Sequence, residues 1–323
     1  SKNTKIMTVV KYNYNGKKIA AVSFRGKSLA PYSPGDYWGT TVPFWFGTCK
    51  MAINNGVLAC NFARKMYNGH QSNMVFYINC KNMKRIDGDI PYVSHSFDQA
   101  CIATSDGGFL MANQGDAYPR GFVVSKIDKE RYFSENATIF HFREGVDRDY
   151  GYNETFAQLG GVAETENTYV FAAASERTLS RNVKKKDESR DVFVQILKKD
   201  FMNFENEKMF YAKGSTRKAT GKKPKKALTK LFLEGNEKDY GIIWLTDYKG
   251  KYYAENPKGL SYEDKIVVMW ERRSMKTYEL KGSYYTILNE DGTVYRKTKK
   301  IGNCILPEDA EPAIKDGKIY WST

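Results

Sequence analysis

The sequence predicts an all-β repeat fold built from four-stranded antiparallel units. Short stretches in which apolar and polar residues alternate recur along all 323 residues, and Gly, Asn and Asp bound them. This period of two is typical of half-buried strands, and no stretch shows the 3.6-residue period of an amphipathic helix. Aromatic residues make up 14% of the chain, and aromatic side chains favour pleated strands over helices.

The predicted strands also recur in the same order. Five apolar segments follow a turn: Gly56–Asn61, Gly108–Asn113, Tyr169–Ala174, Gly241–Thr246 and Gly317–Ser322. The first four precede a second apolar strand: Met74–Ile78, Phe122–Ile127, Val192–Leu197 and Ile266–Trp270. A further strand follows at Thr138–Phe142, Lys208–Ala212 and Tyr284–Leu288, and one precedes the turn at Gln99–Thr104 and Phe156–Ala163. The unit is therefore a meander of four strands.

In this architecture the chain resembles β-propellers over essentially its whole length, although no signature of a particular propeller family is present. The resemblance implies a single domain over 1–323 with five blades, or with six or seven if two units have been merged. The N-terminal strands Ile6–Tyr12 and Lys18–Phe24 would pair with the C-terminal strands to complete one blade, which closes the ring and removes exposed sheet edges. A pair of β-sandwiches is the alternative, since the repeat is too long for a β-solenoid.

In a propeller meander, the connections between the second and third strands and those between blades emerge on one face, called here the long-loop face. The predicted turns between first and second strands are tight, whereas the predicted long loops, among them Asp247–Asp264, lie on this face. Binding residues on rigid scaffolds usually lie on such loops. We therefore expect the ligand site there, formed by His70, Gln71, His95, Asp116, Tyr118, Arg120, Arg148 and Glu154.

Basic residues outnumber acidic ones by 51 to 37, and this excess favours anionic partners. The segment Lys213–Lys230 is rich in Lys and Arg and has no acidic residue. It also has no aromatic residues for base stacking, so recognition of phosphate or sulfate without sequence readout fits it better than sequence-specific nucleic-acid binding. A solvated loop is the alternative. The candidate polyanion-binding residues are Arg217, Lys218, Lys222, Lys223, Lys225 and Lys226.

The aromatic residues Tyr32, Tyr37, Trp38, Trp45 and Phe46 either form a platform for a sugar or pack in the core. Three carboxylates of the long-loop face, Asp98, Asp116 and Asp147, are of the type that glycosidases use in pairs. Nucleophile motifs, phosphate-binding loops and metal-ligand spacings are missing, so we expect no cofactor and no metal.

These observations predict a non-catalytic, monomeric binding protein, secreted or attached to a bacterial surface, whose ligand is a glycan, an anionic polymer or a protein. The alternative is a propeller enzyme acting on glycans through the three carboxylates. An intracellular, cytoplasmic scaffold is a third possibility, which free thiols would suit. No apolar run is long enough to cross a membrane, and a signal peptide is either absent or already removed.

The five cysteines are an odd number, so at least one thiol is free. A hairpin turn at Asn55–Gly56 places Cys60 opposite Met51 and leaves Cys49 on the diagonal, farther away than easy bridging allows. We expect all five cysteines to be free.

Overall fold

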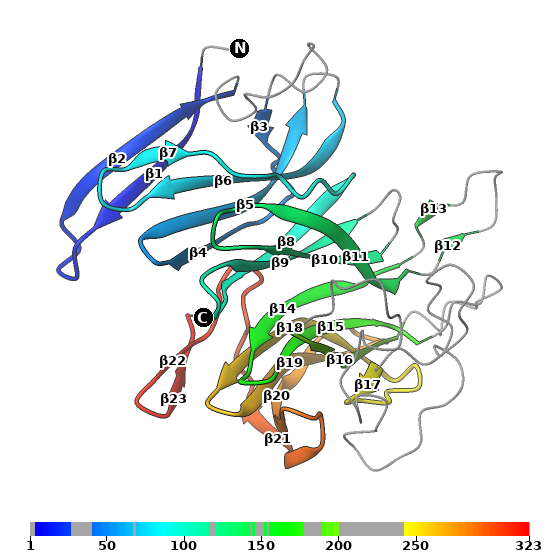
Figure 1. Ribbon diagram of the computed structural model, residues 1–323. Coiled ribbons are helices and arrows are strands. Elements are labelled where there is room, and N and C mark those ends of the chain that lie inside the picture. Colours follow the sequence, from blue (N-terminus) through cyan, green and yellow to red (C-terminus); the bar gives the residue numbers. More distant parts are fainter. Residues whose placement is uncertain are drawn as a thin grey trace. The chain divides into compact units, whose positions relative to one another are not determined.

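The computed structural model describes residues 4–26, 41–66, 69–115, 121–142, 144–145, 152–153, 155–177, 189–199 and 242–322. The elements with defined bounds in these ranges are all strands, which confirms the predicted fold class (Figure 1). They form consecutive antiparallel sheets of the meander type that makes up a propeller blade. The structure divides into two compact units, and the division falls within strands β10 and β11.

Unit 1 comprises Ser1–Pro119 and Val123–Asn136. It starts with a hairpin of β1 (Lys5–Tyr12) and β2 (Lys18–Arg25). A sheet in the order β3-β5-β6-β7 follows, with β4 also paired to β5: β3 (Thr41–Pro43), β4 (Cys49–Asn54), β5 (Val57–Met66), β6 (Gln71–Asn79) and β7 (Lys84–Ile86). The next sheet has the order β11-β10-β9-β8: β8 (Ser96–Ala103), β9 (Phe109–Gly115), β10 (Gly121–Ile127) and β11 (Phe133–His141).

Unit 2 comprises Arg120–Phe122 and Ala137–Thr323. A short hairpin joins β12 (Glu144–Gly145) to β13 (Tyr152–Asn153), and a meander in chain order follows: β14 (Gln158–Glu164), β15 (Thr168–Glu176), β16 (Arg190–Lys198) and β17 (Ile242–Trp244). A second meander contains β18 (Tyr252–Tyr262), β19 (Lys265–Ser274), β20 (Leu280–Asn289) and β21 (Val294–Gly302). The chain continues into the hairpin of β22 (Ala313–Lys315) and β23 (Lys318–Tyr320).

The two meanders of unit 2 pack against each other through one apolar cluster that includes Val194, Ile243, Val268 and Trp270. Their first strands approach closely. A Cβ on Gly160 of β14 would lie 2.9 Å from Cβ of Pro257 of β18, closer than ordinary side-chain contacts, so a glycine permits this approach. Trp270 is 1% exposed, and burial of such apolar area is the main stabilising contribution in a sheet-on-sheet core.

The hairpin turn between β4 and β5 forms where the sequence predicts it. Asn55 and Gly56 have φ values of 46° and 76°, the left-handed values that a tight two-residue hairpin turn requires. Cys60 is opposite Met51 in the register, as expected. All five cysteines are free, but the Sγ atoms of Cys49 and Cys60 lie 3.5 Å apart. The diagonal therefore brings the two thiols into contact, which the sequence argument did not expect.

The predicted strand order is wrong for one unit. The segment Gly241–Thr246 was expected to be a second strand, but its described part forms β17, the fourth strand of the preceding sheet. Accordingly β19 and β20 are the second and third strands of their sheet rather than the third and fourth. The expected long loop from Asp247 to Asp264 is instead mostly strand β18. The predicted strand Lys208–Ala212 lies outside the described residues.

The described strands thus give four multi-stranded sheets and separate terminal hairpins, β1–β2 and β22–β23. Pairing between these two hairpins, the five-blade count, the single domain and the monomeric state stay predictions. No helix in the described ranges is long and apolar enough to cross a membrane.

Candidate functional site

A tight turn interrupts the first strand of the β3–β7 sheet. Both sides of the turn bond to one residue of β5: the Phe44 N–H donates to Ala63 O (3.0 Å), and the Ala63 N–H donates to Thr48 O (3.1 Å). Between them the Gly47 N–H donates to Phe44 O (3.0 Å). A Cβ on Gly47 would lie 2.1 Å from Cβ of Ala63. Glycine at position 47 therefore allows the turn to pack closely against β5, and the two central residues of the turn project away from the sheet.

These central residues are Trp45 and Phe46, called here the aromatic platform. Trp45 is 80% exposed and Phe46 is 69% exposed, and their ring centroids lie 3.8 Å apart at an interplanar angle of 33°. The ring of Phe44 anchors the turn against Phe97 at 5.3 Å. Two large aromatic rings held together in solvent add little to the core, and exposed apolar patches of this kind mark interaction surfaces.

Polar groups at the start of β8 hold the turn in place. The Thr48 N–H donates to Phe97 O (2.9 Å), and the Gln99 N–H donates to Thr48 Oγ1 (2.8 Å). The Thr48 hydroxyl lies 2.9 Å from Gln99 Oε1 and 3.3 Å from Asp98 Oδ1. Asp98, a half-buried carboxylate predicted for the site, is therefore attached to the strand segment that follows the platform.

His70 and His95, both predicted for the site, come together at the long-loop end of the same sheet. Their ring centroids lie 4.3 Å apart. His70 Nε2 lies 3.0 Å from Ser94 Oγ and 3.2 Å from the Tyr92 hydroxyl. Gln71 lies beside them, and its carbonyl accepts the His95 N–H at 2.8 Å.

Charge and burial keep the imidazole of His70 neutral. Burial is the largest cause of its lowered pKa, followed by repulsion from His95 and Arg64. Arg64 is 3% exposed, and burial also lowers its pKa, to about 10. Its Nε donates to Ser72 Oγ at 2.7 Å. A charged imidazole would therefore face a buried cation and a second imidazole.

Beneath these residues lies a buried network of side-chain amides. Asn73 Nδ2 donates to Pro91 O (2.7 Å), and the Val93 N–H donates to Asn73 Oδ1 (2.8 Å). Asn61 Nδ2 donates to Asn113 Oδ1 at 3.2 Å. The network fixes the segment before β8, and with it the position of the histidines.

The long-loop end of unit 2 carries charges, which the sequence analysis did not single out. Glu271 is fully buried, and its carboxylate accepts bonds from Leu306 N–H (2.7 Å), Asn256 Nδ2 (3.1 Å) and Arg273 Nη2 (2.7 Å). Arg273 also pairs with Glu255. Because each acceptor here is occupied, this network holds β18 and β19 together.

Of the predicted site residues, the structure places His70, Gln71, His95 and Asp98 at the long-loop end of unit 1. The others lie outside the described residues: Asp116, Tyr118, Arg120, Asp147, Arg148, Glu154 and the basic residues of 213–230. In the described ranges no group of three metal-ligating side chains comes together. Of the aromatic residues that the sequence offered for a sugar platform or for the core, Trp45 and Phe46 are exposed, whereas Tyr32, Tyr37 and Trp38 lie outside the described residues.

Comparisons with known proteins match the fold only. No family model matches the sequence, and no curated protein matches it significantly. An α-L-arabinanase of Cellvibrio cellulosa is 12% identical, with a TM-score of 0.39 and coverage of 82% of this chain and 80% of that one. A GH43 endo-arabinanase from Bacillus licheniformis is 9% identical (TM-score 0.40, 88% of each chain). A Trypanosoma rangeli sialidase is 12% identical (TM-score 0.39, 84% of this chain and 36% of that one). Likenesses at this level carry no assignment of activity.

Proposed function

We propose that the protein binds a glycan at the long-loop end of unit 1, with Trp45 and Phe46 as the binding platform. The observation that carries the proposal is the turn over 44–47, which exposes two neighbouring aromatic rings, 3.8 Å apart and tilted by 33°, and interrupts the strand. A sugar ring has an apolar C–H face and a rim of hydroxyls. An exposed aromatic face matches the first, and nearby polar groups match the second.

The surroundings of the platform supply such polar groups. Asp98 is a half-buried carboxylate and would accept hydrogen bonds from sugar hydroxyls; charge-assisted bonds of this kind are about twice as strong as neutral ones. His70 and Gln71, at the same end of the sheet, add donors and acceptors. A neutral imidazole suits a neutral sugar better than a cation would.

The test is binding of neutral and acidic oligosaccharides, first on a glycan array and then by calorimetry with the best ligand. The double substitution Trp45→Ala and Phe46→Ala should weaken binding at least tenfold, about 1.4 kcal/mol. Replacing Trp45 with Tyr, which keeps a ring, should restore part of the affinity. Full affinity in the double variant would overturn the proposal.

Tyr14→Ala is the matched control, because Tyr14 is also a fully exposed aromatic residue but lies in the β1–β2 turn. This control should bind as the parent does. A direct readout is available too: a sugar stacked on the exposed Trp45 should shift its fluorescence to the blue, whereas Trp244 and Trp270 are buried and should not respond.

Glycoside hydrolysis is the second candidate function, and the position of Asp98 near the platform favours it. Hydrolysis requires a pair of carboxyl groups about 5–10 Å apart. Asp98→Asn should then abolish release of reducing sugar and leave binding intact. If Asp98→Asn lowers binding and no hydrolysis is found with the parent, the protein is a binding module.

A glycan ligand fits a secreted or surface-attached monomer, which remains part of the proposal. The anionic-polymer partner expected for 213–230 also remains a proposal. Replacing Lys222, Lys223, Lys225 and Lys226 with Ser should weaken heparin binding and reduce its salt dependence.

A further inference from the structure

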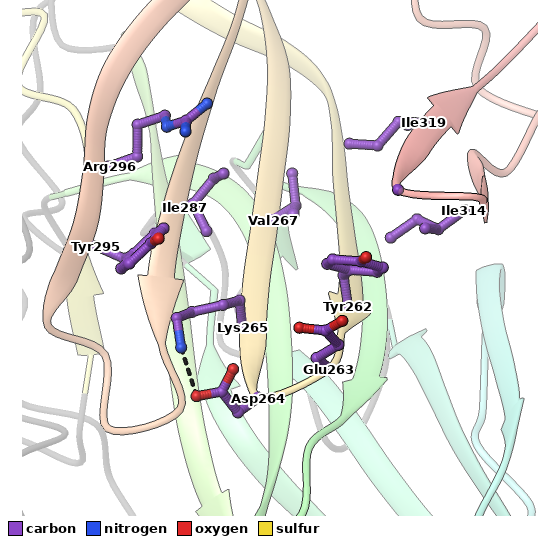
Figure 2. A pocket seen from close by; sticks show the side chains of 11 residues that line it. Tyr262, Glu263, Asp264, Lys265, Val267, Ile287, Tyr295, Arg296, Ile314 and Ile319 are labelled. Carbon is purple, nitrogen blue, oxygen red and sulfur yellow. Dashed lines mark hydrogen bonds and ion pairs between the residues drawn. The ribbon is translucent and has the colours of Figure 1, made fainter.

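A second site lies in unit 2, at the opposite end of the β18–β21 sheet from the buried Glu271. A cavity of about 380 Å³ opens there between this sheet and the β22–β23 hairpin. Val267 and Ile287 form its floor, and Ile314 and Ile319 of the hairpin form one wall (Figure 2). Apolar floors with few polar groups at the rim are the usual form of small-molecule sites.

The rim of the cavity has two exposed tyrosines. Tyr262 at the end of β18 and Tyr295 on β21 flank the opening from opposite sides (Figure 2), and they are 38% and 60% exposed. Lys265 lies 5.1 Å from the centre of the Tyr295 ring and pairs with Asp264. Two ring faces across an apolar floor would hold a flat ligand of sugar size.

Charges divide the cavity into two ends. Glu263 and Asp264 form the tight turn between β18 and β19, so carboxylates lie at one end. Arg296 lies at the other end, separated from them in Figure 2 by the tyrosines and Lys265. A ligand that spans the cavity would meet hydrogen-bond acceptors at one end and a guanidinium at the other.

A β-bulge places a second cation, Lys299, on the same face of the sheet as Arg296, just beyond the residues that line the cavity. Arg296 is opposite Ile287 in the register, and Lys299 is opposite Tyr285, with a shift between them. Ile287 and Tyr285 are two residues apart on β20, so they share one face of the sheet, and Arg296 and Lys299 share that face with them. Without the extra residue, Lys299 would point to the other face. Bulges often re-aim side chains in this way at functional sites.

The two cations are available to a ligand. Both are exposed residues of β21, and Lys299 forms no ion pair with any residue that the structure describes. Interaction with the Tyr285 hydroxyl raises the pKa of Arg296, so its guanidinium is charged. A guanidinium binds a carboxylate through two parallel bonds, which a lysine cannot do.

We propose that this cavity binds an acidic sugar unit of a polysaccharide, with its carboxylate on Arg296 and Lys299 and its hydroxyls toward Glu263 and Asp264. A nucleic acid is disfavoured, because its phosphates would lie near two carboxylates and its backbone offers few hydroxyl donors to them. A hexuronate has both a carboxylate and several hydroxyls, so it satisfies both ends of the cavity. This site is separate from the aromatic platform.

The experiment measures binding of trigalacturonate, of the neutral galactose trimer, of a sulfated dextran and of a thymidine oligonucleotide by calorimetry at low salt. The variant Arg296→Gln/Lys299→Gln should lose at least tenfold in affinity for trigalacturonate. The control variant Lys297→Gln/Lys300→Gln removes the same charge from the same strand. Lys300 is opposite Tyr284, on the other face of the sheet, so this control should stay within twofold of the parent.

Equal losses in the two variants would mean that only the general basic charge of β21 matters, and this would overturn the proposal. So would preference for the oligonucleotide, or for the sulfated over the carboxylated polymer. Tyr295→Ala should also weaken trigalacturonate binding, whereas the platform variant at Trp45 and Phe46 should not. If the parent protein binds neutral glycans through the platform but does not bind trigalacturonate, only the proposal for this cavity is refuted. If the parent protein binds no glycan at all, neutral or acidic, the aromatic platform is refuted as well.

Discussion

The long-loop ends of the two units use different chemistry at corresponding strand ends. In unit 1 the side chains that join neighbouring strands bond to neutral partners: the amides of Asn61 and Asn73 bond to amide and backbone groups, and the buried cation Arg64 donates to the hydroxyls of Ser72 and Thr41. In unit 2 the corresponding positions hold ionised groups, with Glu271 shared between Arg273 and backbone donors. Most buried polar groups in both arrangements are bonded, as is usual in protein interiors, but the Nδ2 of Asn113 in unit 1 has no partner among the described residues.

The two networks differ in which groups lose their hydrogen-bond partner when one residue of the network is removed. Removing an amide from unit 1 leaves a neutral donor or acceptor without a partner, whereas removing Glu271 leaves Arg273 facing less negative charge in a part-buried place. Arg273 would keep its pair with Glu255, but the Leu306 N–H and the Asn256 amide would lose their shared acceptor as well, so more buried donors are left without a partner than in unit 1. The charged end should therefore be the more fragile of the two, and the neutral end the more sensitive to pH through its histidines.

The largest effect is expected from Glu271→Ala. This change removes the acceptor of the bonds from Arg273, Asn256 and Leu306, and it should lower the free energy of unfolding by about 3–5 kcal/mol. Urea denaturation measures it. The control Glu279→Ala removes an exposed carboxylate that pairs with Lys281 and should leave the urea midpoint unchanged. Similar midpoints for the two variants would show that the buried network does not hold β18 and β19 together.

Asn73→Ala tests the neutral end and should cost less. It leaves the Val93 N–H and the Pro91 carbonyl without their side-chain partner, which we expect to cost about 1–3 kcal/mol. Asn15→Ala, in the exposed β1–β2 turn, is the control. If Asn73→Ala destabilises the protein more than Glu271→Ala does, the ranking of the two ends is reversed.

The third expected effect depends on pH. Burial, with His95 and Arg64 nearby, lowers the pKa of His70 in the folded protein below the ordinary value of 6.5. Between the two pKa values the unfolded chain binds more protons, so stability is full above pH 6.5 and falls as the pH drops toward the folded pKa. The urea midpoint of the parent should therefore fall between pH 7.5 and 5.5 by more than that of His70→Gln. An identical fall in both would assign it to other groups.

The smallest effect on stability is expected at the aromatic platform. Trp45→Ala should change the free energy of unfolding by no more than about 0.5 kcal/mol, because the side chain is 80% exposed. The same urea titration checks this. A large loss would mean that Trp45 packs against the protein in solution, and the platform would then not be free for a glycan.

The sequence predicts those strands whose turn residues or apolar runs can be recognised within a few consecutive residues. The β4–β5 hairpin follows from Asn55–Gly56, and β15 and β16 follow from continuous apolar runs. Strand β18 was missed because Asn256, Pro257 and Gly259 interrupt it, and a proline within a run normally argues against a strand. The structure tolerates this proline because the register shifts between Glu255 and Lys258, with Asn256 at a φ of 49°.

The sites could be predicted only in part for a related reason. His70 and His95 were grouped correctly because both flank predicted strands at the same end. The cavity in unit 2 was missed because Tyr262, Glu263 and Asp264 were assigned to a loop, and the effect of the bulge on Lys299 depends on pairing with β20, which is not local. The charged network around Glu271 was missed because it depends on the pairing of β18 with β19 and on the approach of Leu306, neither of which a local pattern shows.

Arg190 has a consequence for how unit 2 moves. It starts β16, yet its guanidinium donates to the carbonyls of Ala254 and Phe156 at 3.0 Å each and lies 4.8 Å from the centre of the Tyr253 ring. One side chain thus ties the two meanders together at the end where they could separate. Amide hydrogens of β16 and β19 should consequently exchange in a single cooperative opening.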